Sequence, residues 1–426
     1  MSGIHAAAAL LLFVATLSLV LIRPRRVPEG VFALGGALGM LLVGAVSPRE
    51  ALAIILGAWN AFLFFLGMLV AAAAADRAEV FTRLAGLAAR GAGGSGWRLL
   101  LNLFLLGSAI TAILSNDATA LLLTPVVFAL VVRLGLPPRP YAFTCSFVAN
   151  AASLLLPVAN PANILVLQVV PMTLPQFLGR LLLPALVALA VTFAGLLLVF
   201  RDDLVVGFGA KPTAGAADHP RGFAVTLAGL CLLAAGYLAG AALEAPLGLV
   251  ALAGATIILL AQALVGALAP RAIASEVAWG IFPFLAGMLV LVRGIENAGL
   301  TPLLGALLAR AVASGGLLAP LLTAVGAALG ANLINNLPMA LIAASTVAAA
   351  PAAPSTHQDL AAAVLLGVDL GPNLTIVGSL STMLWLLLLR RRGLDVSGLE
   401  YLRVGALLLP PALLAAALTL WLVQQL

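Results

Sequence analysis

The chain has 426 residues, of which 63% are hydrophobic and 8% charged, and its formal net charge is +6. A soluble core cannot bury so large an apolar share, so the composition excludes a soluble globular protein. The basic residues are scattered singly between apolar segments, which argues against a nucleic-acid partner. Repeated apolar stretches of about 20 residues have the length needed to cross a lipid bilayer. We therefore predict an all-α polytopic membrane protein.

The first apolar stretch covers residues 4–22. Its positive cluster, Arg23, Arg25 and Arg26, follows the apolar run instead of preceding it, unlike the order in a signal peptide. We interpret this stretch as a retained membrane helix.

Breaks rich in proline, glycine and charge divide the chain into two sets of apolar segments. The first set covers residues 4–22, 29–46, 51–75, 98–133, 141–170 and 178–200, and the second covers 222–242, 246–268, 279–293, 316–350, 361–389 and 402–422. We interpret 98–133 and 316–350 as helical hairpins that enter and leave on the same side, re-entrant or, as the alternative that charge leaves open, fully spanning, and every other segment as one crossing. The halves are then 1–205 and 222–426, joined by a cytoplasmic connector at 206–221.

Charge predicts the sidedness of these segments. With the N-terminus outside, only Arg49, Arg180, Arg293 and Arg310 lie outside, and the other seventeen of the chain's 21 lysines and arginines are cytoplasmic. This bias agrees with the positive-inside rule, and a single misplaced crossing would scatter it. Both termini are therefore predicted to be periplasmic.

An internal repeat relates the two halves at a nearly constant offset. Trp59 to Val70 matches Trp279 to Val290 at the aromatic, glycine and methionine positions, and Asn116-Asp117 falls opposite Asn335-Asn336, one position off the same offset. With five crossings per half, the second copy starts on the opposite side, which predicts two inverted repeats and alternating access. Chance similarity among leucine-rich segments is the alternative.

Two acidic residues stand apart from the other thirteen, which sit in loops or at segment ends. Asp117 and Asp369 lie deep inside apolar runs, with no intramembrane lysine or arginine nearby. A carboxylate at the bilayer centre costs at least ~2.5 kcal/mol, so it usually faces a wet cavity and serves ion or substrate movement. Burial favours the protonated acid, as proton coupling requires. We predict that both residues couple protons, the alternative being a protonated aspartate that caps a broken helix.

Four polar breaks surround these acids, at residues 115–119, 157–163, 332–338 and 369–375. Free backbone groups at membrane depth are tolerated only where they line protein or a water-filled cavity, so converging breaks would form a site for a small polyhydroxylated solute. The alternative is that the breaks are packing kinks, and Asn60, Asn102 and Asn332 could bond to neighbouring helices. The predicted substrate-binding residues are Ser115, Asn116, Asn160, Asn163, Asn335, Asn336, Asn373, Thr375 and Ser379.

Residues 78–90 alternate apolar positions with Arg83 and Arg90, a pattern that fits a helix lying in the cytoplasmic interface. Such a helix could link a moving domain to a fixed one. The alternative is a plain charged loop.

No motif predicts a cofactor. The two cysteines, Cys145 and Cys231, are far apart in sequence and lack the spacing of a metal site or a disulfide framework. Residues 91–96 match GxGxxG, but no strand precedes them, and the chain contains no GxxxxGK[ST] nucleotide-binding loop.

Three segments carry a resemblance to a known family: Leu114 to Pro125, Asn335 to Met339 and Asp369 to Trp385. They resemble the signature segments of ArsB-type arsenite and antimonite efflux permeases, and the similarity extends over nearly the whole chain. The resemblance implies export of As(III) or Sb(III) coupled to proton influx, elevator-type alternating access and a bacterial inner membrane. It also implies assistance, in some members, from a soluble arsenite-stimulated ATPase subunit. Asn373 departs from the pattern, because the family often carries a lysine there.

Chemistry agrees with this substrate, since arsenite at neutral pH is mostly the uncharged trihydroxide, which amides and carboxylates can bind without thiols. The resembling superfamily also contains sodium/proton antiporters and anion carriers, which remain the alternative. A passive channel would show flux that ignores the proton gradient. An intramembrane aspartyl protease needs a GxGD signature, whereas this chain has Gly367-Val368-Asp369. We therefore expect a transporter and not an enzyme.

Overall fold

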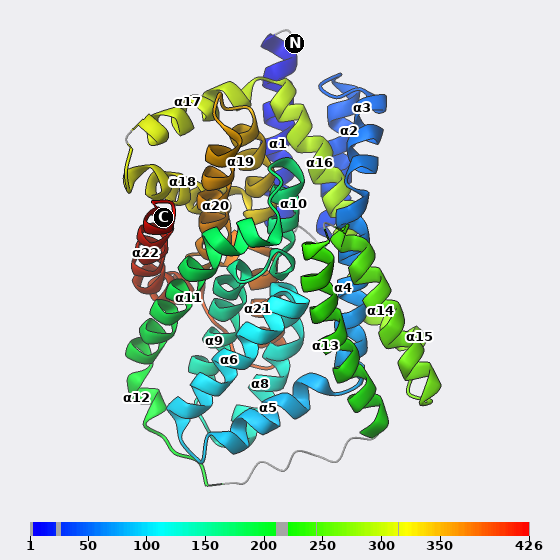
Figure 1. Ribbon diagram of the computed structural model, residues 1–426, viewed down its shortest axis with the longest axis vertical. Coiled ribbons are helices and arrows are strands. Elements are labelled where there is room, and N and C mark those ends of the chain that lie inside the picture. Colours follow the sequence, from blue (N-terminus) through cyan, green and yellow to red (C-terminus); the bar gives the residue numbers. More distant parts are fainter. Residues whose placement is uncertain (1–2, 23–26, 210–219, 244, 314, 426) are drawn as a thin grey trace.

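The computed structural model describes residues 3–22, 27–209, 220–243, 245–313 and 315–425 (Figure 1). Arg23, Arg25, Arg26, Lys211 and most of the predicted connector lie outside the described residues. Every regular element within those ranges is helical, and eight helices are long and apolar enough to cross a membrane. The chain is thus an all-helical membrane protein, as its composition predicted.

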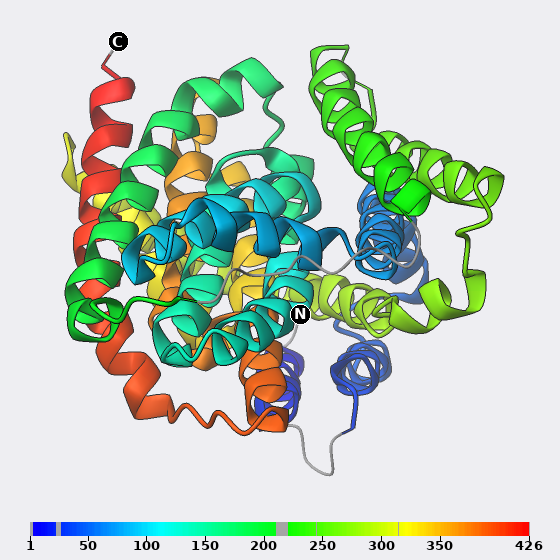
Figure 2. The same ribbon diagram turned by 90° about the horizontal axis from the view of Figure 1, so that it is seen from below.

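The helices form two bundles, which Figure 2 shows lying side by side. The smaller bundle combines helices from both halves of the chain: α1 (Gly3–Ile22), α2 (Glu29–Leu42), α3 (Pro48–Gly57), α4 (Trp59–Arg77), α13 (Pro220–Ala242), α14 (Leu247–Leu264), α15 (Pro270–Glu276) and α16 (Ile281–Asn297).

The larger bundle likewise draws on both halves. From the first half come α5 (Val80–Gly91), α6 (Gly96–Leu114), α7 (Asn116–Ala118), the π-helix η2 (Thr119–Leu123), α8 (Thr124–Arg133), α9 (Pro138–Ala151), η3 (Ala152–Leu154), η4 (Pro157–Ala159), α10 (Pro161–Val169), α11 (Leu174–Val199) and α12 (Arg201–Leu204). From the second half come α17 (Leu300–Ala313), α18 (Leu318–Ile334), α19 (Asn336–Ala348), α20 (Pro354–Leu370), η5 (Gly371–Asn373), η6 (Ile376–Gly378), α21 (Leu380–Arg391) and α22 (Gly398–Val423).

Glycines of the repeated motif bring helices of the smaller bundle into close contact. A Cβ atom on Gly67 of α4 would lie 2.3 Å from the carbonyl carbon of Ala251 on α14, and one on Gly287 of α16 would lie 2.4 Å from that of Ala33 on α2. Small residues at such crossings let two membrane helices approach backbone to backbone. Gly67 and Gly287 are equivalent positions of the matched motif, so the repeated sequence has the same packing role in both halves.

The two bundles are joined by short turns at equivalent positions. Glu79, with φ of +57°, connects α4 to α5, and Gly299, with φ of +91°, connects α16 to α17. The predicted interfacial segment is helical as α5. It buries Phe81 and Ala85 and exposes Thr82 and Arg90, which is the expected amphipathic pattern.

Both predicted hairpins are present. In the first, Gly107 of α6 packs beside Leu123, and the Thr111 and Thr119 hydroxyls are 2.7 Å apart across the turn. In the second, Gly330 of α18 packs beside Met339 of α19. Figure 1 shows the first hairpin toward the lower end of the molecule and the second toward the upper end.

The hairpins turn at residues with unusual backbone conformations. Ser115 has φ of +91° and Asn335 has φ of +76°, a region that residues with a side chain rarely adopt. The offset between these two turns is the same as that between Trp59 and Trp279. The structure therefore pairs Ser115 with Asn335 and Asn116 with Asn336, and the register that placed Asn116 opposite Asn335 was one residue out.

The remaining two polar breaks also share one geometry. In each half a helix ends in two successive 3₁₀ turns before a new helix begins, as α9–η3–η4–α10 and as α20–η5–η6–α21. The new helices start at Asn160 and Ser379, both extended in backbone, and each side chain accepts a hydrogen bond from a backbone N–H of the first turn.

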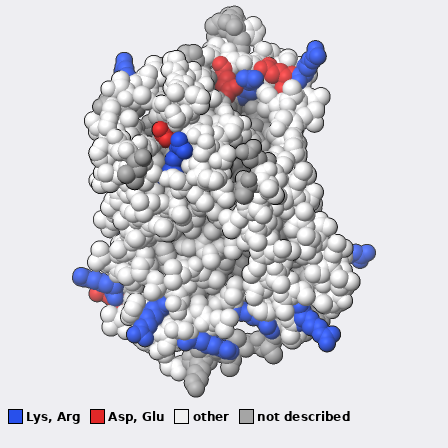
Figure 3. Space-filling model, in the orientation of Figure 1, with Lys and Arg blue, Asp and Glu red and all other residues white. Residues whose placement is uncertain are grey.

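Charged side chains gather at the two ends of the molecule. Figure 3 shows arginines along the lower end and a mixed group of acidic and basic residues at the upper end. Two arginines that were predicted to lie outside are ion-paired: Arg293 lies 3.0 Å from both Glu50 and Glu296, and Arg180 lies 2.8 Å from Asp359.

Candidate functional site

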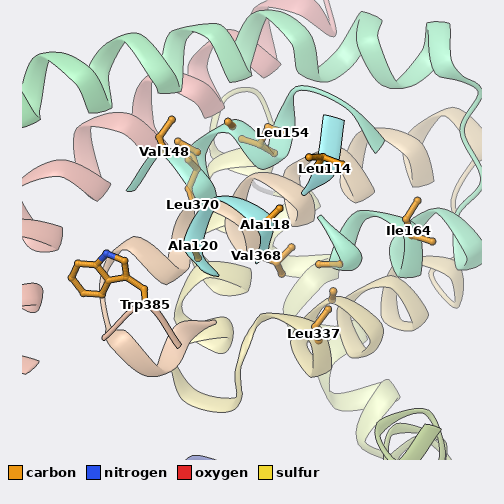
Figure 4. Close-up of a cluster of buried hydrophobic side chains, with 14 of the residues drawn as sticks. Leu114, Ala118, Ala120, Val148, Leu154, Ile164, Leu337, Val368, Leu370 and Trp385 are labelled. Carbon is orange, nitrogen blue, oxygen red and sulfur yellow. The ribbon is translucent and has the colours of Figure 1, made fainter. Parts of the chain in front are cut away.

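The residues that flank the four polar breaks belong to one buried apolar cluster. Figure 4 shows Leu114 and Ala118 around the first hairpin turn, Leu337 after the second, and Val368 and Leu370 around Asp369. Polar groups inside such a cluster are costly unless they are hydrogen-bonded. The hydrogen-bond partners of the break residues therefore decide which of them support the fold and which remain available.

Asp117 connects the first hairpin to the second half of the chain. Its side chain, on α7, is 9% exposed, and its carboxylate accepts a hydrogen bond from the hydroxyl of Ser381 on α21. Sequence reasoning did not select Ser381. The available signal was its position in the polar run of residues 379–382, two residues after the predicted Ser379.

Asp369 connects the two broken helices. Its carboxyl group on α20 is 1% exposed, and its Oδ1 accepts a hydrogen bond of 2.7 Å from Asn160 Nδ2 at the start of α10. The Asn163 amide lies beside the same carboxyl group, while its Nδ2 donates to the Ser153 carbonyl at 2.7 Å. Two predicted asparagines and the predicted acid thus meet in one place.

Several buried polar atoms at the breaks have no hydrogen-bond partner in the part of the chain that the structure describes. They are one hydroxyl, two amide oxygens and one carboxyl oxygen: Ser115 Oγ, Asn116 Oδ1, Asn163 Oδ1 and Asp369 Oδ2. Buried polar atoms in native proteins are nearly always paired, so a group of unpaired ones at helix breaks marks a place where a polar solute or water binds.

Other predicted residues are hydrogen-bonded within the protein framework. Asn335 accepts from Leu337 N at 3.4 Å and donates to the Val377 carbonyl at 3.3 Å. The Ser379 hydroxyl lies 2.8 Å from that of Thr382 and accepts from its N–H at 3.1 Å. Asn336 is buried in the first turn of α19. Asn335 and Ser379 thus hold the shape of the breaks.

Asn373 faces an asparagine of the other half. Its Oδ1 accepts from Asn150 Nδ2 at 2.9 Å, and its own Nδ2 donates to the Phe147 carbonyl at 3.4 Å. Sequence reasoning did not select Asn150, although it begins the segment of the first half that matches the Asp369 region. The position where the resemblance led us to expect a lysine is filled here by an amide pair.

Asn332 binds four groups at once. Its Nδ2 donates to the carbonyls of Ala328 and Gly371, both at 2.8 Å, and its Oδ1 accepts from the N–H and the hydroxyl of Thr375 at 3.1 and 2.6 Å. Asn60 and Asn102 likewise bond to neighbouring helices, at Gly248 N and the Ala88 carbonyl. These three asparagines are packing residues, and the Thr375 hydroxyl belongs to the same brace.

Two larger cavities approach the breaks from different sides. The first, of about 560 Å³, lies between α5 and α8 and is lined by the charged residues Asp76, Glu79, Arg83, Arg133 and Arg392. The second, of about 590 Å³, lies between the starts of α4 and α14 and the helix α10. Its described lining is uncharged and includes Pro157 and Ile164, which flank Asn160 and Asn163 in sequence.

A third, small cavity of about 30 Å³ contains Ser115 and Asp117 in its wall. It shares Leu121 and Leu122, both on the π-helix η2, with the wall of the charged cavity. The π-helix therefore separates Asp117 from the charged cavity by a thin apolar layer.

Within the described residues, no group of three or more histidine, cysteine, aspartate or glutamate side chains could hold a metal ion. Cys145 is buried on α9, and Cys231 is exposed on α13. With two cysteines in the whole sequence, a three-thiolate site cannot form.

Comparison with known proteins agrees with this architecture. The chain is 30% identical over 409 residues to the arsenical pump membrane protein of Escherichia coli (strain K12), covering 94% of this chain and 95% of that protein. It is 31% identical, with the same coverage, to the arsenical pump membrane protein of Yersinia enterocolitica. An uncharacterized transporter of Mycobacterium tuberculosis is 28% identical over 428 residues, covering 97% of each chain.

Among solved structures, the YdaH transporter of Alcanivorax borkumensis has a similar fold, with a TM-score of 0.55, 15% identity, and coverage of 87% of this chain and 86% of that one. The arsenical pump membrane protein family, ArsB, matches residues 8–423. This match spans both bundles and all four breaks, and the chain belongs to the ArsB family of membrane transporters.

Proposed function

We propose that this transporter exports arsenite and antimonite from the cytoplasm across the bacterial inner membrane in exchange for protons, with both termini in the periplasm. The observation that carries the proposal is the set of unpartnered buried oxygens at the breaks, together with two buried aspartates, in a chain of the ArsB family.

The chemistry of these oxygens suits an uncharged trihydroxide. As(OH)₃ can donate three hydrogen bonds, and Ser115 Oγ, Asn116 Oδ1, Asn163 Oδ1 and Asp369 Oδ2 are all able to accept one. Asn160, Asn335, Asn336, Asn373, Thr375 and Ser379 complete the proposed substrate-binding site, in which they surround the solute. A site of oxygen and amide groups also releases its solute readily, as a pump requires.

Asp117 and Asp369 are the proposed proton carriers. Each has its carboxyl group among apolar residues and accepts a hydrogen bond from a neutral side chain, Ser381 or Asn160. Neither side chain is in an ion pair among the described residues, so a bound proton is the way to neutralise either charge without desolvation cost.

The two halves, 1–205 and 222–426 with the connector 206–221, are proposed to be inverted repeats of five crossings and one re-entrant hairpin each. Equivalent contacts support this: α4 packs on α14 through Gly67, and α16 packs on α2 through Gly287. The first pair lies in the lower part of Figure 1 and the second in the upper part, as an inverted copy requires.

Alternating access then follows as motion of the larger bundle against the smaller one. The two large cavities lie on different sides of the breaks and have walls from both bundles or from their junctions. The turns at Glu79 and Gly299 join the bundles at equivalent positions, where such motion would pivot. Solute bound at the breaks would face one cavity and then the other.

The test is uptake of As(III) into liposomes that contain the purified chain in the everted orientation, with an acid interior and without ATP or sodium. The proposal expects accumulation that a protonophore abolishes and that Asp369→Asn removes. Absence of uptake, with sodium-dependent proton movement instead, would assign the chain to a sodium/proton antiporter. Uptake that requires ATP and an added soluble subunit would show that an ATPase partner drives the pump.

A further inference from the structure

Glu276 lies beside the proposed proton carrier Asp117 although the two belong to different bundles. Glu276 ends α15, and its side chain lines the same cavity of about 30 Å³ as Ser115 and Asp117. A single buried water needs about 10–15 Å³ of such space, so the cavity is large enough to place water between the two carboxyl groups.

Glu276 in turn lies next to residues at the end of α4. Its Oε1 is 3.5 Å from Arg77 Nη1, and it interacts electrostatically with Asp76. The side chain of Glu276 is 28% exposed, and Asp76 is half-buried in the wall of the charged cavity. The other charged groups near this route are Arg271 on α15 and Glu79, Arg83, Arg133 and Arg392 around the cavity.

We propose that Glu276 and Asp76 form the path by which protons pass from Asp117 to the cytoplasmic cavity. This inference rests on the proton coupling in the proposed function and assigns residues to its inner half. In each step a carboxylic O–H bond breaks and an O–H bond forms on water or on the next carboxylate, from Asp117 to Glu276, to Asp76 and to the solvent of the cavity. Arg77 stabilises the ionised form of Glu276 between transfers.

The route exists on one side of the molecule only. At the offset that relates Ser115 to Asn335, Glu276 corresponds to Leu56, and Asp76 corresponds to Glu296, which is ion-paired with Arg293 at 3.0 Å. The described lining of the second large cavity carries no acidic residue. Glu276, which has no acidic counterpart at the equivalent position, is therefore not a by-product of the repeat, and its place in the same cavity wall as Asp117 calls for a role there.

The experiment compares two activities of the full-length protein in liposomes. Net proton-driven As(III) uptake needs a carrier that releases its proton, whereas exchange of internal for external As(III) at equal pH does not. For Glu276→Gln and for Asp76→Asn we expect uptake to fall about 10-fold or more while exchange stays within about two-fold of wild type. Glu276→Asp should restore part of the uptake, and Glu296→Gln, at the equivalent position in the other half, should leave both activities unchanged.

Full uptake by Glu276→Gln would overturn the proposal while leaving proton-coupled arsenite export intact. Equal loss of uptake and exchange, without recovery in Glu276→Asp, would assign Glu276 a structural role and would also overturn it. A wild-type protein that moves arsenite without protons would overturn the proposed coupling and the path together.

Discussion

The two hairpins share the backbone conformation of their turns and differ in their chemistry. Both turn at a residue with a side chain and a positive φ, Ser115 in the first and Asn335 in the second. The first then presents Asp117, where the second has Leu337 at the equivalent position. In the first hairpin the Ser115 hydroxyl and the Asn116 amide oxygen have no partner among the described residues, whereas both ends of the Asn335 amide are hydrogen-bonded. The two turns thus share a backbone conformation, and the unpartnered polar atoms lie at the first of them.

The arms beyond the two turns differ as well. The first hairpin continues through the π-helix η2, and the second continues directly into the α-helix α19. A π-helix costs hydrogen-bond geometry and is frequent at functional sites. Here it lies between Asp117 and the charged cavity, whose walls share Leu121 and Leu122 with the small cavity at Asp117.

In the hairpins the acid belongs to the first half of the chain, whereas in the broken helices it belongs to the second half. The first pair of 3₁₀ turns begins at Ala152 and the second at Gly371, so Asp369 in the second half corresponds to Asn150 in the first. Each half therefore supplies one acid, from the hairpin in the first and from the broken helix in the second.

Asp117→Asn should have the largest effect on transport, because it removes the acid that distinguishes the first hairpin from the second. The amide keeps the size of the side chain and its contact with Ser381 but cannot carry a proton, so we expect proton-driven As(III) uptake to fall about 100-fold, the low end of the cost of removing a proton-transfer group. The measurement is uptake in liposomes with an imposed pH gradient.

Leu337→Asn is the matched control, because it introduces the same amide at the equivalent position of the second hairpin. We expect the folded variant to retain uptake within about three-fold, since no proton step depends on Leu337, while the cost of burying its amide should appear as a lower thermal stability. Full uptake in Asp117→Asn would remove Asp117 from proton coupling and with it the contrast between the hairpins.

Gly67→Ala and Gly287→Ala test the close helix crossing that each half of the chain contains. The added Cβ atoms would meet backbone atoms at 2.3 and 2.4 Å, so the helices must separate, at a cost of about 1–3 kcal/mol in each case. Thermal unfolding in detergent should show nearly equal losses for the two variants. Gly57→Ala, in the exposed last turn of α3 with open space around it, should lose nothing. A loss for one of the two glycines alone would mean that the crossings are not equivalent.

Much of this architecture could be predicted because polar residues inside apolar segments are rare and costly. The four breaks, both hairpins and the two buried aspartates follow from that rule alone. The alignment of the hairpins was off by one residue because asparagines were matched by identity, whereas the turn is set by backbone conformation at Ser115 and Asn335. Sequence shows which side chains are present and not which of them adopts a positive φ.

The pairing of polar groups could not be predicted, since it depends on how helices from opposite halves of the chain are rotated against each other. Ser381 with Asp117 and Asn150 with Asn373 are such pairs. The same limit applies to the hydrogen bonds of Thr375 with Asn332 and of Ser379 with Thr382, while the predicted contact of these two residues with substrate stays a prediction. Glu276 was placed among acids at segment ends, and only the packing of α15 beside the first hairpin brings it to Asp117.

Asn332→Ala tests how much the hydrogen bonds of Asn332, which the first half lacks, contribute to stability. The equivalent residue of the first half is Ala112, so only the second half has this four-fold brace. Removing it leaves the Thr375 N–H and the Gly371 carbonyl without their partner, and we expect a loss of about 1–3 kcal/mol in thermal unfolding. Asn102→Ala, which removes one bond to the Ala88 carbonyl, should cost less. Equal losses would show that the brace adds nothing beyond a single hydrogen bond.

The smallest expected effects come from the ion pairs at the two ends. Arg139 and Glu400 lie 2.9 Å apart at half-exposed positions, and such pairs contribute less than about 1 kcal/mol, which salt reduces further. Arg293 is held by Glu50 and Glu296 together, and Asn297 donates to Glu50, so this group is a network and not an isolated pair. Glu50→Gln should therefore lower thermal stability more than Glu400→Gln, and raising the salt concentration should narrow the gap between them. A larger loss of thermal stability for Glu400→Gln than for Glu50→Gln would contradict this expectation. It would mean that the charges at the lower end in Figure 1 support the fold, so that membrane orientation alone would not explain the positive charge there.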